Sequence, residues 1–213
     1  PTESTQKILL GEGFNKSNII VTGNTIVDAV FQNLNIAEKK STILNTLNKS
    51  KGEYILVTVH RAENTDDKLR LENILKGINL LCEKYNLKAI YPIHPRTKKM
   101  IKEYNISLPT NLEVIPPMGY LDFLIMQKNA RLVITDTGGI QEETCILNIP
   151  CVTVRNNTER PETLKVGSNI LAGTDPDKII NSSEKMLKSD RNWENPFGDG
   201  KAGKRILENI LSA

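Results

Sequence analysis

The chain has 213 residues, of which 38% are hydrophobic and 25% are charged, as in globular proteins that bury an apolar core. Its formal net charge of +3 is too small to indicate nucleic-acid binding, and no basic run is interleaved with aromatic residues. No apolar run is long enough to span a bilayer and no signal peptide is recognisable, so we expect a cytoplasmic protein without membrane insertion. The cysteines Cys82, Cys145 and Cys151 stand singly in apolar surroundings, which favours buried thiols over disulfides or a metal site.

The first fifty residues are predicted to be helical and to precede the main domain. Helices are predicted over 2–13, with Thr2 as N-cap, and from Thr25 onward through 37–47, with a brief strand over 18–21 between them. Because the chain opens on a helix start and not on methionine, we expect the amino-terminal portion of a larger protein to precede it. Residues 1–50 are therefore interpreted as crossover helices and a linker, and residues 51–213 as the main domain.

In the main domain, strand patterns alternate with helix patterns. Strands are predicted over 54–59, 89–93, 112–115, 132–135, 150–154 and 169–172, and helices over 66–85, 97–104, 120–128, 140–147, 175–188 and 203–211. The segments 60–64 and 155–162 are predicted to be loops. This alternation is typical of an α/β fold, a Rossmann-like parallel sheet flanked by helices with right-handed crossovers.

The stretch 132–143 combines a buried strand, a glycine pair and a helix start. Asp136 and Thr137 can cap the helix, and Gly138-Gly139 allows a ligand to approach the backbone without meeting a Cβ atom. Free N–H groups and the helix dipole at such a start suit a diphosphate, while a carboxylate one turn further can accept hydrogen bonds from a ribose diol. The alternative is an ordinary tight turn between strand and helix.

Polar clusters follow four of the predicted strands, at 60–64, 94–96, 136–139 and 158–162, and in an open α/β sheet such loops meet at one edge. Both histidines of the chain are among them, although a single histidine after a strand is more often structural than catalytic. Four arginines could neutralise a diphosphate or could be solvated surface charges: Arg61, Arg96, Arg155 and Arg160.

Other nucleotide and metal chemistries are disfavoured by missing motifs. Neither the P-loop pattern nor GxGxxG occurs, which disfavours an ATPase or a nicotinamide enzyme. The absence of HExxH or of paired His/Cys spacing likewise disfavours a metal site.

Four motifs carry a resemblance to a known family. VTVHRAEN (57–64), IHP (93–95), TDTGGIQEE (135–143) and NTERPE (157–162) resemble, in order and approximate spacing, the UDP-N-acetylglucosamine 2-epimerase family. The opening PTE and the VTGNT at 21–25 are similar to the family's crossover between its two domains. The resemblance runs nearly end to end but covers only the second half of a family member. Two departures are Ala62, where the family often has a second arginine, and Thr137 in place of serine.

The resemblance implies the carboxy-terminal half of a glycosyltransferase-B-type fold, with UDP held on its Rossmann-like domain, 51–213. It implies diphosphate contacts from Thr137, Gly138 and Gly139, ribose contacts from Glu143, uracil contacts from the backbone around Phe123, phosphate contacts from Arg160, an active-site role for His60, and a regulatory UDP-N-acetylglucosamine site at Arg61 and His94.

The implied reaction is elimination of UDP followed by its re-addition with C2 inverted, which interconverts UDP-N-acetylglucosamine and UDP-N-acetylmannosamine without cofactor or metal. The family keeps the proton-exchanging carboxylates on its amino-terminal domain, so this chain alone is expected to bind UDP without epimerising, and the full-length protein is expected to be a homodimer. Alternatives are the hydrolysing branch, which releases N-acetylmannosamine and UDP, a non-catalytic nucleotide-sugar-binding module, and a retaining glycosyltransferase.

Overall fold

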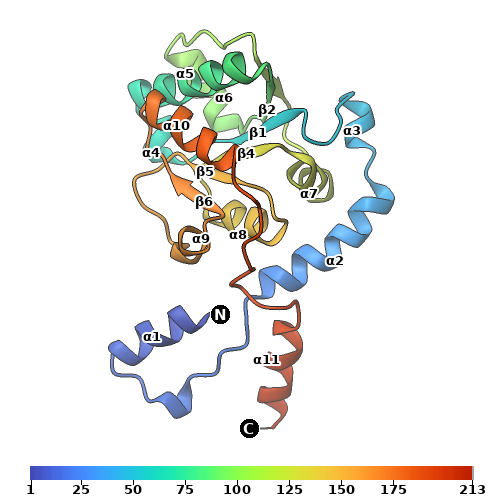
Figure 1. The fold of residues 1–213 in the computed structure, drawn as a ribbon, viewed down its shortest axis with the longest axis vertical. Helices are drawn as coiled ribbons and strands as arrows, with labels where there is room; N and C mark the ends of the chain where they lie inside the picture. The colour runs from blue at the N-terminus through green and yellow to red at the C-terminus, as the bar shows by residue number, and fades with distance from the viewer. Residues whose placement is uncertain (213) are drawn as a thin grey trace.

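A computed structural model describes residues 1–212 of the chain. At its centre lies a six-stranded parallel sheet with strand order β3-β2-β1-β4-β5-β6, which confirms the predicted Rossmann-like fold class (Figure 1). The strands are β1 (Tyr54–Thr58), β2 (Lys88–Pro92), β3 (Leu112–Ile115), β4 (Leu132–Thr135), β5 (Cys151–Thr153) and β6 (Asn169–Leu171).

Helices cover both faces of the sheet (Figure 1). They are α1 (Glu3–Gly11), α2 (Thr25–Lys40), α3 (Ile43–Thr46), α4 (Ala62–Thr65), α5 (Lys68–Tyr85), α6 (Pro95–Glu103), α7 (Tyr120–Asn129), α8 (Gly138–Ile146), α9 (Pro161–Lys165), α10 (Pro176–Leu187) and α11 (Ala202–Leu211), with one 3₁₀ turn, η1 (Lys16–Asn18). Apolar side chains of α5, α6 and α10 join the core on one face, and those of α3, α7 and α8 join the core on the other.

The central strand β1 is buried on both faces, as its uninterrupted apolar run predicts. Ile55 and Val57 belong to the core under α5 and α10, whereas Tyr54 and Leu56 belong to the core under α7. The alternation of side chains along the strand therefore fills both layers. The parallel direction of the strands places the loop after β1 at the carboxyl edge of the sheet.

Helices α5 and α10 approach each other closely at Gly77. A Cβ atom at this position would lie 3.1 Å from the Ile179 Cβ and 3.1 Å from the Pro176 Cα. Because one of these neighbours is backbone, the contact cannot relax by a simple side-chain rotation. Glycine is thus required here for packing, although it is an unfavourable residue inside a helix.

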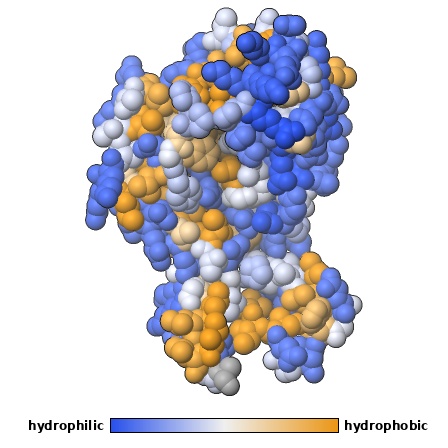
Figure 2. Space-filling model, turned by 180° about the vertical axis from the view of Figure 1, so that it is seen from behind, coloured by the Kyte–Doolittle hydropathy of each residue, from blue (hydrophilic) through white to orange (hydrophobic). Residues whose placement is uncertain are grey.

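Helices α1 and α11 lie at one end of the molecule, away from the sheet (Figure 1). Asp28 of α2 connects this end to the rest by accepting hydrogen bonds from the amides of Ala202 (3.1 Å) and Gly203 (3.0 Å) at the start of α11. Figure 2 shows hydrophobic residues gathered over this end. Exposed apolar side chains there are Ile8, Leu10, Phe14, Ile206, Leu207, Ile210 and Leu211.

Most predicted elements are present, and Thr2 caps α1 as expected by accepting from the Thr5 amide at 3.2 Å. The strand predicted over 18–21 is wrong, because η1 and an irregular segment occupy this region and no sheet neighbour is available. The continuous helix predicted over 37–47 is also wrong. Ser41 interrupts it by donating a 2.6 Å hydrogen bond to Asp122 of α7.

Two predicted loops contain helical turns. Helix α4 follows Arg61 inside the expected loop 60–64, and α9 begins at Pro161, at the end of the expected loop 155–162. Proline at the first position of α9 is pre-organised for a helix start, a signal that the polar composition of the loop hides. Within residues 1–212, none of the helices combines the length and apolar character that crossing a membrane requires.

Candidate nucleotide site

The order of the sheet reverses between β1 and β4, and ligands in this fold class bind in the crevice outside the carboxyl ends of those strands. His60 follows β1, His94 follows β2, Asp136 follows β4 and Arg155 follows β5. The parallel strands therefore deliver all four predicted polar clusters to one edge of the sheet. This is the arrangement that the sequence predicted.

A cavity of about 230 Å³ opens at this edge. The imidazole rings of His60 and His94 lie beside each other in it, with centroids 5.6 Å apart and planes tilted by 31°. Four predicted site residues, His60, His94, Phe123 and Thr137, each with a different predicted role, thus share one cavity. Its lining consists of Thr58, Val59, His60, Tyr91, Pro92, His94, Pro117, Met118, Phe123, Thr137 and Ile140.

Helix α8 begins at Gly138, so both glycines lie in its first turn and not before it. Neither glycine has a positive φ, so glycine is not required here for its backbone conformation. Its contribution is the space left by the missing side chain. A Cβ atom on Gly139 would meet nothing within 4 Å, whereas one on Gly138 would lie 3.4 Å from Glu159 Oε2 and 3.8 Å from the Arg160 Cγ. The open space at Gly139 lets a ligand oxygen reach the free amides of the helix start.

Glu143 lies one turn into α8 and is only 6% exposed. Its carboxylate accepts a 2.6 Å hydrogen bond from Gln127 Nε2 and a 3.1 Å hydrogen bond from the Tyr120 hydroxyl. Burial raises the pKa of Glu143, and the hydrogen bonds from Gln127 and Tyr120 offset this only in part. A carboxylate fixed in this way retains lone pairs that a diol could fill.

Asp136 does not cap α8, in contrast to our expectation. Its side chain is fully buried and turns toward the loop after β1, where it accepts from the backbone amides of His60 and Arg61 and from Asn64 Nδ2. Thr137 occupies the N-cap position without a side-chain capping bond. The sequence offered one signal for this role, namely an acidic residue placed directly after a strand that is buried on both faces.

Three of the four candidate arginines are already paired with carboxylates: Arg96, Arg155 and Arg160. Arg155 is 6% exposed and donates to Glu63 at 2.6 Å and to Glu159 at 2.9 Å, and these partners raise its pKa. Arg96 is bound to Asp66 on the surface. The structure therefore assigns Arg155 to holding the loop together and does not present it as a free phosphate ligand.

Arg160 lies beside the helix start, where its Cγ is 3.8 Å from the Cβ position of Gly138. Its Nε is 2.7 Å from Glu142 Oε1, an ion pair whose carboxylate is nearly buried and also accepts from Asn24 Nδ2 at 2.9 Å. About a third of the Arg160 side chain is exposed, and one of its guanidinium nitrogens, Nη1, donates to the Glu159 carbonyl at 2.9 Å. Arg61 contributes its amide to Asp136, and its side chain remains partly exposed.

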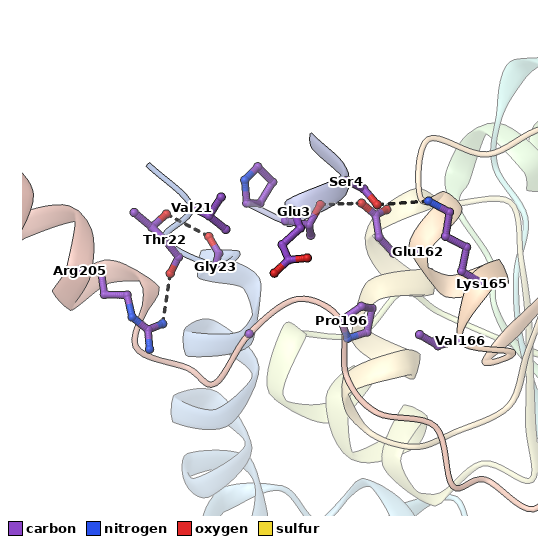
Figure 3. Close-up of a pocket in the computed structure, with 13 residues that line it drawn as sticks. Glu3, Ser4, Val21, Thr22, Gly23, Glu162, Lys165, Val166, Pro196 and Arg205 are labelled. Carbon is purple, nitrogen blue, oxygen red and sulfur yellow. Dashed lines mark hydrogen bonds between the residues drawn. The ribbon is translucent and has the colours of Figure 1, made fainter. Parts of the chain in front are cut away.

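A second cavity, of about 450 Å³, lies between the start of the chain, α9 and the segment before α11 (Figure 3). Thr2 donates to Glu162 at 2.8 Å, and Lys165 donates to Ser4 at 3.2 Å. These contacts hold the first residues of the chain against α9, the helix that directly follows Arg160. No pattern in the sequence predicts this long-range contact.

The chain matches the family model described as UDP-N-acetylglucosamine 2-epimerase over residues 1–211. UDP-N-acetylglucosamine 2-epimerases of Methanocaldococcus jannaschii and Methanococcus maripaludis are 52% and 53% identical to it, over 97% and 99% of this chain and 58% and 59% of theirs. The crystal structure of the M. jannaschii UDP-GlcNAc 2-epimerase in complex with UDP-GlcNAc and UDP superposes with a TM-score of 0.92, at 50% identity, over 100% of this chain and 60% of that one.

The chain thus spans about 60% of the length of these relatives. The motif resemblance and the expected fold class are both confirmed, because the matches extend over nearly every residue and include both histidine loops and the glycine pair. The chain belongs to the UDP-N-acetylglucosamine 2-epimerase family.

Proposed function

We propose that this chain binds the UDP moiety of a nucleotide sugar at the carboxyl edge of its sheet. The observation that carries the proposal is the spacing of two features on α8: open, Cβ-free space at Gly139 and a buried carboxylate at Glu143, one turn further along. In UDP the diphosphate is joined directly to the ribose. The diphosphate requires backbone amides, and the ribose diol requires an acceptor about one helical turn away from them. The solved relative that contains UDP-GlcNAc and UDP supports the same ligand.

In this arrangement the diphosphate meets Thr137, the amides of Gly138 and Gly139, and the guanidinium of Arg160. The dipole of α8 favours negative charge at its start, and Arg160 adds a positive charge held nearby by Glu142. The uracil lies toward Phe123, which lines the same cavity as Thr137. Each part of UDP is then assigned to a different element, which explains why the motifs lie far apart in the sequence.

For the whole protein we propose UDP-N-acetylglucosamine 2-epimerisation of the non-hydrolysing type, in the cytoplasm and as a homodimer. His60 stabilises negative charge on the diphosphate as UDP leaves C1 of the sugar. Arg61 and His94 are candidates for a second, regulatory UDP-N-acetylglucosamine, since His94 lies beside His60 without being part of α8. Residues 1–50 act as the crossover to a further domain, and 51–213 as the UDP-binding domain.

The carboxylates that exchange the C2 proton belong, by family resemblance, to a part of the relatives that this chain does not span. We therefore infer that the 213-residue chain binds UDP but does not epimerise. The inference is tested by calorimetry with UDP, GDP and pyrophosphate, together with a C2 deuterium-exchange assay on UDP-N-acetylglucosamine.

Binding of UDP in clear preference to GDP, without deuterium exchange, is the expected result. Equal binding of UDP and GDP would contradict the uracil assignment, and measurable exchange by the chain would contradict its inactivity. In the whole protein, release of free N-acetylmannosamine instead of UDP-N-acetylmannosamine would identify the hydrolysing reaction.

A further inference from the structure

Asp136 is a carboxylate without solvent exposure that directly follows β4, two residues before the glycine pair. Its Oδ2 atom accepts from the Arg61 amide at 2.9 Å, from the His60 amide at 3.0 Å and from Asn64 Nδ2 at 3.1 Å. Burying an ionised carboxylate is costly unless several donors compensate for the lost water. Here three donors converge on one oxygen, and two of them are the backbone amides that bracket the His60 side chain.

The same loop is held from its other side through the carbonyl of Val59. Thr97 Oγ1 donates to this carbonyl at 2.9 Å, and the hydroxyl of the buried Tyr91 donates to it as well. Residues 59–61 are therefore fixed by side chains from β2, from α6 and from the residue that follows β4. A loop with this many buried anchors is pre-organised before any ligand arrives.

The carboxylate also lies close to the His60 ring. His60 Nδ1 is 3.8 Å from Asp136 Oδ1, while 40% of the His60 side chain remains exposed. With Nδ1 nearest the carboxylate, Nε2 is the ring nitrogen left for a ligand, and it donates when the imidazole carries both protons. Asp136 thus connects the glycine turn after β4 with the histidine after β1, the two components that must meet one diphosphate.

We propose that Asp136 is a positioning residue that holds the His60 imidazole at the diphosphate, a role that rests on the nucleotide site proposed above. It acts through His60 and does not itself contact the ligand. The expected consequence is thermodynamic coupling: removing Asp136 costs affinity for UDP only as long as His60 is present.

The test is a double-mutant cycle on UDP affinity, measured by calorimetry for the unchanged chain, Asp136→Asn, His60→Ala and the double variant. Each single substitution is expected to weaken UDP binding by roughly tenfold, the size of one lost charge-assisted contact. The double variant is expected to be no weaker than the weaker single variant. Multiplicative losses, about a hundredfold in the double variant, would show that Asp136 acts independently of His60 and would overturn the proposal.

Uridine serves as the matched control ligand, because it contains the ribose that Glu143 binds but no phosphate. Asp136→Asn is expected to leave uridine affinity within about twofold of the unchanged chain. An equal loss for uridine and UDP would assign Asp136 to general stability, since a merely structural role does not distinguish the two ligands.

A second measurement keeps the proposal open to refutation if Asp136→Asn fails to fold. Hydrogen exchange of the His60 and Arg61 amides in the unchanged, ligand-free chain is expected to be slow, whereas the amide of the exposed Asn157 provides a fast reference. Unprotected His60 and Arg61 amides would overturn the pre-organised loop. A chain that binds no UDP would contradict the proposed function, whereas normal UDP binding by Asp136→Asn would contradict only the positioning role.

Discussion

Gln127 donates a 2.6 Å hydrogen bond to Glu143 and thereby connects α7 with α8 inside the nucleotide site. Both side chains are buried, and among residues 1–212 the Gln127 Oε1 atom has no hydrogen-bond partner. The pair keeps the Glu143 carboxyl group in a place where water cannot solvate it fully. A site of this kind favours ligand binding at a cost in stability.

We predict that Glu143→Gln stabilises the ligand-free chain at neutral pH. Burial raises the pKa of Glu143 above its ordinary value of 4.5, so the folded state binds more protons than the unfolded state between these two values. Stability is therefore lost as pH rises from about 4.5 through the raised pKa, and the amide removes this loss. Thermal unfolding at several pH values measures it, with roughly 2–4 °C expected for each kcal/mol regained.

The pH-dependent part of the gain from Glu143→Gln should be absent at pH 4 and should grow with pH until Glu143 is fully ionised. The amide also supplies a donor for the unpartnered Gln127 Oε1, a contribution that does not depend on pH. A pH-independent gain would therefore show that hydrogen bonding dominates over burial of charge.

We predict that Glu143→Ala weakens UDP binding by about 1–3 kcal/mol, because a charge-assisted acceptor for two hydroxyls is lost. Pyrophosphate contains no ribose, so its affinity should be nearly unchanged. Calorimetry with the two ligands on the same preparation provides the comparison. Equal losses for both ligands would mean that Glu143 serves the fold and not the ribose.

Gly139→Ala should separate binding from stability. No atom lies within 4 Å of the added Cβ, so the ligand-free helix should tolerate alanine and gain up to about 0.5–1 kcal/mol. UDP binding should nevertheless fall by about tenfold or more, because the methyl group fills the space through which phosphate reaches the amides. Unfolding and calorimetry on the same variant test both statements, with Gly11→Ala, at the open end of α1, as a control remote from the site.

Arg160 and Arg96 provide a matched pair of arginine substitutions. Arg160→Met should reduce affinity for UDP and for pyrophosphate by about tenfold each, because its guanidinium acts on the phosphates. Arg96→Met removes a surface ion pair with Asp66, and it should leave both affinities unchanged. A loss confined to UDP in the Arg160 variant would contradict its assignment to the phosphates.

Gly77→Ala should destabilise the chain by roughly 1–2 kcal/mol, although alanine is the better helix former. The added Cβ would lie 3.1 Å from both Ile179 and the backbone of Pro176, and overpacking of this kind outweighs the propensity gain of about 1 kcal/mol. Denaturant unfolding measures the change. Gly139→Ala, also in a helix but with open space around it, should instead raise the free energy of unfolding.

Much of the fold could be predicted from the sequence because hydrophobic patterns that indicate strands and helices are local. Apolar runs such as 132–135 and the helical period of 68–85 are readable without knowing their neighbours, since each face must be buried somewhere. The strand predicted over 18–21 failed for the same reason: strand-forming residues make a strand only where a partner is available, and Ile19 and Ile20 have none.

For the candidate site, too, some features could be predicted from the sequence and others could not. His60, Gly139, Glu143 and Arg160 could be proposed from motifs, because their residue types and positions after strands are visible in the sequence. The partners of these residues could not, since a hydrogen bond depends on distances across the fold.

Asp136 was expected to cap a helix, and only the tertiary structure shows that it holds the His60 loop, 76 residues away along the chain. It also paired Arg155 with Glu63, and Gln127 with Glu143. The sequence by itself determined which groups reach the edge of the sheet, because parallel strands carry their following loops there. Only packing decided which donor meets which acceptor. A buried charged group must be compensated by hydrogen bonds or an opposite charge, and the residues able to supply these are those that the fold places beside it.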